Sequence, residues 1–114
     1  MKIKIMELGV PNKNGRLYSA EVMAKAAAKA KFPLLIDTNR EAPTLVSAAG
    51  FAYSLNIEGA DVMAECTFTN ADIGQQVASG ALHVVPAGIG TVLPDGTVAN
   101  DYMINYLFVT DDPA

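Results

Sequence analysis

The sequence predicts an α+β domain in which two helices pack on a small curved antiparallel sheet, or barrel, of about seven strands. Several segments alternate apolar and polar residues, as half-buried strands do, and two others begin with a residue that caps helices well. Strands and helices do not alternate regularly, which argues against a doubly wound fold. The 114 residues match the usual size of one domain, so we expect residues 1–114 to form a single unit.

The first half of the sequence has the clearest strand and helix signals. Lys2-Ile3-Lys4-Ile5 alternates strictly and predicts a strand over residues 2–8. Ser19 is placed to cap a helix over residues 20–30, with Glu21 in its first turn, and Phe32-Pro33 ends that helix. The short apolar run at residues 33–37 predicts a buried strand.

The middle of the sequence is typical of a hairpin. A long strand is expected over residues 44–57, bent or bulged where Ser47-Ala48-Ala49-Gly50 supplies only small side chains. The turn at Glu58-Gly59-Ala60-Asp61 leads into a returning strand over residues 62–68.

The last part repeats the pattern of a helix followed by strands. Asn70 as cap, Asp72 in the first turn and Gly80 as stop predict a short helix over residues 71–79. The remaining expectations are a strand over 82–86, a hairpin tip over 91–98 and a final strand over 102–110.

Composition restricts the partners of this protein. The net charge is −4 and the pI is about 4.7, which argues against nucleic acid or an anionic membrane as a partner. No apolar run is long enough to span a membrane, and the first residues are not typical of a secretory signal. With only 18% charged residues, much of the surface is neutral or apolar, so we expect a homo-oligomer or a subunit of an assembly.

Candidate catalytic groups are few, and none forms a convincing set. His83 is the single histidine, and Ser79 lies four residues earlier, but the predicted helix end at Ser79 and strand at His83 do not bring them together. Cys66 has no neighbouring cation in the sequence and is interpreted as a buried, inert thiol that fits a reducing compartment. We therefore predict no catalytic residue.

Metal and cofactor sites are not predicted either. One His, one Cys and scattered carboxylates give no spaced ligand cluster. Asp111-Asp112 is interpreted as the solvated end of a strand and Asp95 as a turn residue. Gly88-Ile89-Gly90 lacks the lysine and following helix of a phosphate loop, so it predicts a tight bend.

One motif resembles a known family. Asn12-Lys13-Asn14-Gly15-Arg16-Leu17-Tyr18, just before a helix that contains Val22 and Met23, resembles the Asn-x-Asn-Gly-Arg-x-Tyr motif of tailed-phage prohead maturation proteases. Those serine proteases are related in fold to the herpesvirus assembly protease. The resemblance continues through residues 33–37, 48–50, 73–80, 84–90 and 108–114, so it spans nearly the whole sequence.

The departures from that family bear directly on activity. Where active members carry the catalytic His, this sequence has Asp37-Thr38-Asn39-Arg40, and where they carry the nucleophilic Ser it has Val85-Pro86-Ala87. Neither Pro nor Ala can attack a carbonyl, and Asn cannot act as a general base. The resemblance therefore implies a protease-like scaffold without protease chemistry.

The resulting hypothesis is a non-enzymatic structural protein of the phage virion. It would be made in the host cytoplasm and bind the major capsid protein on the exterior of the head, as a decoration or cement subunit. Sheet edges and the loop Asn12–Tyr18 are the candidate contact regions, and a plain turn before a helix is the other interpretation of that loop. Two alternatives stay open: a component of the prohead core or scaffold, and a vestigial protease using Ser47, Ser54 or Ser79 with His83.

Overall fold

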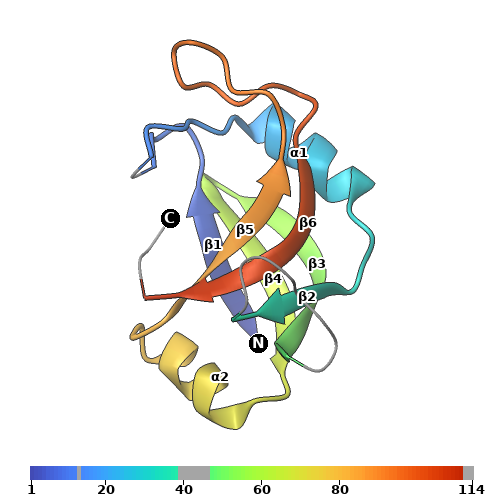
Figure 1. The fold of residues 1–114 in the computed structure, drawn as a ribbon, viewed down its shortest axis with the longest axis vertical. Coiled ribbons are helices and arrows are strands. Elements are labelled where there is room, and N and C mark those ends of the chain that lie inside the picture. Colours follow the sequence, from blue (N-terminus) through green and yellow to red (C-terminus); the bar gives the residue numbers. More distant parts are fainter. Residues whose placement is uncertain (13, 39–46, 112–114) are drawn as a thin grey trace.

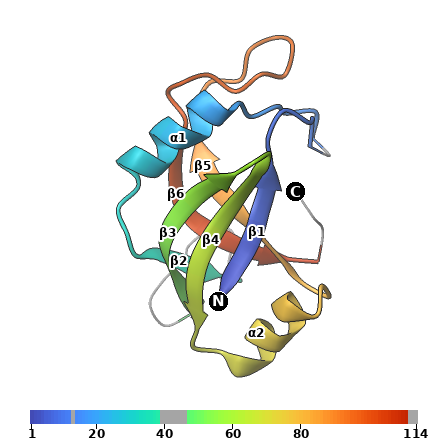
Figure 2. The same cartoon turned by 180° about the vertical axis from the view of Figure 1, so that it is seen from behind.

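In the part of the protein that the structure describes, six strands form one sheet that curls into a half-barrel, with a helix near each end of the long axis (Figures 1 and 2). The computed structural model describes residues 1–12, 14–38 and 47–111. Its elements, in sequence order, are β1 (Lys2–Glu7), α1 (Ala20–Lys29), β2 (Leu34–Asp37), β3 (Ala48–Glu58), β4 (Asp61–Phe68), α2 (Ala71–Ala78), β5 (His83–Ile89) and β6 (Met103–Thr110).

The order of strands across the sheet is β1-β4-β3-β2-β6-β5. Every one of these pairs is antiparallel except β2 and β6, which run parallel. The curl brings the two edge strands, β1 and β5, into contact, although no ladder of hydrogen bonds joins them over their described residues. The α+β class and the two helices are therefore as predicted, whereas the described sheet is mixed and has six strands rather than about seven.

Residues 91–98 turn back as the expected hairpin tip, but they form no strand of the described sheet. Among the described residues this segment makes two isolated bridges, from Val92 to Val98 and from Thr97 to Leu17. Pro94 cannot donate a ladder hydrogen bond, and Gly96 adopts a φ of 91°, so the backbone turns before a strand can extend.

The first strand shows how the alternating sequence is used. Ile3 and Ile5 face the core, while Lys2 and Lys4 face solvent. A shift of register between Lys4 and Met6 then turns Met6 inward as well, so that one strand buries two successive apolar side chains.

Both helices start where the capping residues predict. The Ser19 hydroxyl accepts a hydrogen bond from the Val22 amide at 3.2 Å, and α1 buries Val22, Met23 and Ala26 against β3 and β6. The Asn70 side chain accepts from the Ile73 amide at 3.1 Å, and α2 packs on the end of β4.

The hairpin β3–β4 is confirmed, with its turn at Gly59, whose φ is 63°. The small residues predicted to bend β3 are needed for packing. A Cβ built on Gly50 would lie 2.4 Å from the Thr67 carbonyl oxygen, so only glycine lets β3 approach β4 there. Residues 44–46 of the expected strand lie outside the described residues.

An apolar core fills the half-barrel. It takes side chains from all six strands and from α1, and Phe68, Ile73, Val77 and Leu82 pack at its margin. Its largest fully buried apolar members are Met23, Ile36, Leu107, Val62 and Val84.

Candidate functional site

The sheet register places in one row Asp37 and Val85, which begin the two segments where the resemblance to the prohead proteases leads us to expect catalytic residues. Asp37 of β2 pairs with Phe108 of β6, and on the other side of β6 the same Phe108 pairs with Val85 of β5. Neighbouring strands lie about 4.8 Å apart, so Asp37 and Val85 stand about 10 Å apart in one row across three strands. Asp37 and Val85 therefore lie on the two sides of the one strand β6.

The β2 side of this site holds a buried carboxylate. Asp37 is fully buried, and the Ser47 hydroxyl donates a hydrogen bond of 2.8 Å to its Oδ2 atom. Thr38 follows at the exposed end of β2, and Asn39 and Arg40 lie outside the described residues. Sequence reasoning did not find the Asp37–Ser47 pair, because the two residues belong to different segments and only the fold brings them together.

The β5 side of the site offers no nucleophile. Val85, Pro86 and Ala87 carry no hydroxyl or thiol, and β5 is an edge strand that pairs with β6 alone within the described sheet. Pro86 is paired with Leu107, and proline in a sheet is accommodated where its nitrogen faces the open edge. The edge of β5 therefore has no backbone donor at Pro86.

His83 and Ser79 lie in different elements. His83 lies in β5 opposite Thr110, whereas Ser79 caps the end of α2 and donates its hydroxyl proton to the Gln76 carbonyl oxygen at 3.1 Å. No hydrogen bond joins His83 and Ser79 in the described structure. Ser54 lies on β3, which is separated from β5 by two strands.

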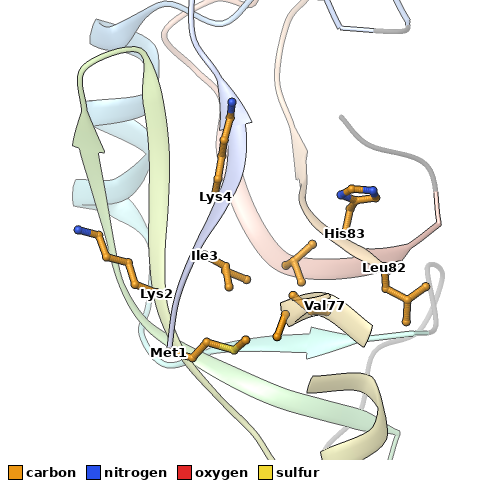
Figure 3. A pocket seen from close by; sticks show the side chains of 9 residues that line it. Met1, Lys2, Ile3, Lys4, Val77, Leu82 and His83 are labelled. Atoms are coloured by element: carbon orange, nitrogen blue, oxygen red, sulfur yellow. The ribbon is translucent and has the colours of Figure 1, made fainter. Parts of the chain in front are cut away.

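His83 lines a hollow of about 340 Å³ between β1, β5 and α2 (Figure 3). Met1, Ile3, Val77 and Leu82 supply apolar surface there, and the side chains of Lys2 and Lys4 extend away from this cluster. Lys2 is paired with Glu58, and the Lys4 ammonium lies 3.1 Å from Asp61. The two lysines beside the hollow are thus paired with carboxylates of β3 and β4.

The Cys66 thiol is buried in β4, as predicted. Burial raises the pKa of this thiol, and the positive charge of the Met1 amino group only partly opposes that effect. A thiol that is buried and protonated is a poor nucleophile. The amino group was not among the neighbours expected from the sequence, because the contact between β1 and β4 creates it.

The loop Asn12–Tyr18, which we call the motif loop, begins with a tight turn. The Asn12 side-chain oxygen accepts hydrogen bonds from the backbone amides of Asn14 and Arg16 at 2.9 and 3.0 Å. The Gly15 amide donates to the Asn12 carbonyl at 2.9 Å, and Gly15 has a φ of 75°. These are the features of a tight turn that a left-handed glycine closes. Asn12 and Gly15 therefore have structural roles, which supports the interpretation as a turn before a helix.

The motif also joins the hairpin tip at residues 91–98 to the rest of the molecule. Leu17 exchanges backbone hydrogen bonds with Gly96 and Val98, so the loop pairs with the segment after Pro94. Tyr18 is buried, and its ring meets that of Tyr102 edge to face at a centroid distance of 5.2 Å.

The glycines at 88 and 90 do not make the expected tight bend. Gly88 lies within β5 at a shift of register, and a Cβ there would lie 2.2 Å from the Met103 carbonyl oxygen. A Cβ on Gly90 would lie 2.8 Å from the Tyr102 Cα atom. The glycines let β5 run close against the start of β6, which a sequence pattern alone does not reveal.

The acidic residues considered as ligands have other structural places. Asp95 accepts from the Thr97 amide at 2.9 Å, as a turn residue does, and this hydrogen bond lowers the pKa of its carboxyl. Asp111 is exposed after β6, and Asp112 lies outside the described residues. Over residues 1–12, 14–38 and 47–111, no three His, Cys, Asp or Glu side chains converge as a metal site.

In the same ranges, every helix is too short or too polar for a transmembrane span.

The half-barrel with its two helices is a prohead-protease-like fold. Among solved structures it is similar to the capsid assembly protease gp21 of bacteriophage T4, with a TM-score of 0.73 and 17% sequence identity. The match covers 96% of this protein and 79% of the T4 protein. No family model and no curated protein matches the sequence. The fold implied by the motif at Asn12–Tyr18 is thereby supported.

Proposed function

We propose that this protein is a non-enzymatic structural protein of a phage head, a decoration or cement subunit that binds the outside of the shell. The observation that carries the proposal is the row Asp37–Phe108–Val85. This row joins the two segments where the resemblance implies a catalytic pair, and Val85-Pro86-Ala87 provides no group that attacks a carbonyl. The scaffold of a head protease without its nucleophile suits a role in binding.

The proposed contact surface is the end of the half-barrel around β5 and β6. Ile89 and Met103 form a cross-strand pair there, and both are exposed. Val92 and Leu93 lie a few residues beyond the end of β5 and are exposed as well. We name these four residues the apolar end. Exposed apolar clusters of this kind mark protein–protein contacts, and the proposed partner is the major capsid protein.

The sheet edges suit this contact less well than the sequence suggested. Lys2 and Lys4 lie on the edge strand β1, and Pro86 lies on the edge strand β5. Lysine and proline on edge strands prevent the addition of a further strand. Side-chain contact through the apolar end is therefore preferred over strand pairing.

The proposed mechanism is mass action. A subunit that binds the assembled shell and has no affinity for its dissociated form stabilises the shell by RT ln(1 + [L]/Kd). Many equivalent sites on a symmetric shell, and association of the subunits with each other as a homo-oligomer, would add to this effect.

A binding assay with matched variants tests the proposal. Heads of the cognate phage lacking this protein are mixed with the purified protein and sedimented. Ile89 is 67% exposed and Tyr53, on β3 away from the apolar end, is 53% exposed. Ile89→Asp is expected to abolish co-sedimentation, whereas Tyr53→Asp leaves it intact. Equal binding by both variants would exclude the apolar end as the contact.

The same material separates the alternatives. A core or scaffold component would be found in proheads and lost from mature particles. The vestigial protease has one observation in its favour, the hydrogen bond from the Ser47 hydroxyl to the buried Asp37 carboxylate. Cleavage of a capsid precursor by the purified protein, abolished by Ser47→Ala, would replace the proposed function with that one.

A further inference from the structure

The motif loop holds a chemically reactive pair in an exposed position. Asn14 and Gly15 are both exposed, at the tip of the turn that Asn12 organises. Asparagine is a thermolabile residue, and a following glycine presents its amide nitrogen without a side chain to hinder it. We propose that Asn14-Gly15 is a site of spontaneous deamidation, and that the turn organised by Asn12 slows this reaction while the turn stays closed.

The reaction requires only the protein and water. The Gly15 amide nitrogen attacks Cγ of Asn14, forms a new bond to it and loses its proton. The bond from Cγ to Nδ2 of Asn14 breaks, and the side-chain nitrogen leaves as ammonia. Water then hydrolyses the resulting succinimide. Cleavage of the bond from the ring nitrogen to Cγ gives aspartate, and cleavage of the bond from that nitrogen to the backbone carbonyl carbon gives isoaspartate.

The hydrogen bonds of the turn oppose the first step. The attacking nitrogen of Gly15 donates to the Asn12 carbonyl oxygen at 2.9 Å. On the other side of the reacting residue, the Asn14 amide donates to the Asn12 side-chain oxygen at 2.9 Å. The backbone on both sides of Cγ is thus fixed, and the nitrogen becomes available only when the turn opens.

The pairing beyond the turn adds to this protection. The Asn12 amide donates to the Arg16 carbonyl, and the Leu17 amide donates to the Gly96 carbonyl, both at 2.9 Å. The Gly15 carbonyl oxygen also lies against Gly96, since a Cβ on Gly96 would lie 2.3 Å from it. Opening at Asn14 therefore requires the loop to separate from the segment around Gly96.

Once formed, isoaspartate would keep the turn open. Its backbone runs through the former side chain and is one carbon longer, so the amide of Gly15 no longer meets the Asn12 carbonyl in the same turn. The new carboxylate also adds a negative charge at the tip of the loop. The step is consequently a one-way change in the shape of this end of the molecule.

Two variants of Asn12 test the proposal in the intact protein. Asn12→Ala removes the side-chain acceptor of both hydrogen bonds, whereas Asn12→Asp keeps it. The proteins are incubated at neutral to mildly alkaline pH, and isoaspartate and aspartate at position 14 are quantified by peptide mass spectrometry. Wild type and Asn12→Asp are expected to react slowly. Asn12→Ala is expected to react about tenfold faster, because an open turn becomes that much more populated.

Reference measurements make each outcome decisive. The same protein in denaturing urea gives the unprotected rate, and the hydrogen-exchange rate of the Gly15 amide reports opening of the turn. A wild-type rate equal to the unprotected rate would overturn the proposal. So would equal rates in Asn12→Ala and wild type, or an Asn12→Asp variant as fast as Asn12→Ala.

Discussion

The rings of Tyr18 and Tyr102 meet edge to face, with centroids 5.2 Å apart and planes inclined by 66°. Tyr18 ends the motif loop and Tyr102 leads into β6, so this contact ties the loop to the last strand of the sheet. Both residues are buried. Their pairing accounts for the tyrosine of the motif without any role in catalysis.

Replacing Tyr18 should therefore reduce stability strongly. Tyr18→Ala is expected to lower the free energy of unfolding by about 3–5 kcal/mol, the range for truncating a buried aromatic side chain. Tyr18→Phe keeps the ring and loses only the hydroxyl, so about 1 kcal/mol is expected. Urea denaturation followed by far-UV circular dichroism measures both values. Equal losses in the two variants would contradict the ring contact as the source.

Tyr102 should make the protein sensitive to alkali. Burial raises the pKa of the Tyr102 phenol well above its ordinary value, and the nearby Tyr18 adds to this shift. The folded state therefore keeps a proton that the unfolded state releases above about pH 10, so stability falls as the pH rises beyond that point. Below it, both states hold the proton and this group has no effect.

The measurement is the free energy of unfolding between about pH 8 and about pH 11. Wild type is expected to lose stability at the alkaline end, and Tyr102→Phe should lose less because it has no proton to release. Parallel pH profiles for the two proteins would show that another group is responsible.

Gly88 should tolerate no side chain. Gly88→Ala places a methyl group against the Met103 carbonyl oxygen, where a Cβ would lie at 2.2 Å, so β5 and β6 must separate. We expect a loss of at least about 2 kcal/mol, as for overpacked sites. Gly59→Ala is the control, because its Cβ meets nothing within 4 Å and only its positive φ opposes the change, for about 1 kcal/mol. The prediction fails if thermal melting ranks the two variants in the opposite order.

The Cys66 thiol should react with disulfide reagents only when the protein opens. It is buried, and its pKa is raised, so the thiolate that reacts is scarce and inaccessible. In the native state an aromatic disulfide reagent is expected to react at least about a hundredfold more slowly than in denaturing urea. Rapid native labelling would contradict the position of Cys66 inside β4.

Elements encoded by neighbouring residues were predictable from the sequence. Ser19 and Asn70 each satisfy an amide within the first turn of their own helix, so a few consecutive residues determine where α1 and α2 begin. The β3–β4 hairpin likewise follows from a turn at Gly59 between two apolar segments.

Features that join distant segments were not predictable. Nothing in the sequence of Leu34–Asp37 identifies β6 as its neighbour, because strands pair through backbone groups that almost every residue carries. The same limit applies to the site. The burial of Asp37 and its bond to Ser47 depend on a neighbouring segment, and the role of Gly88 depends on how closely β6 approaches.

The place of β6 in the sheet has a consequence for how the protein acquires its structure. β6 is the last strand in sequence, yet it lies between β2 and β5, and within the described sheet it alone links β5 by hydrogen bonds to the other four strands. During synthesis, β1 to β4 can associate as soon as they emerge, whereas β5 must wait until β6 has been made. A ribosome-bound polypeptide halted before Met103 would expose the apolar side chains of β5, such as Val84, to chaperones and to other nascent polypeptides.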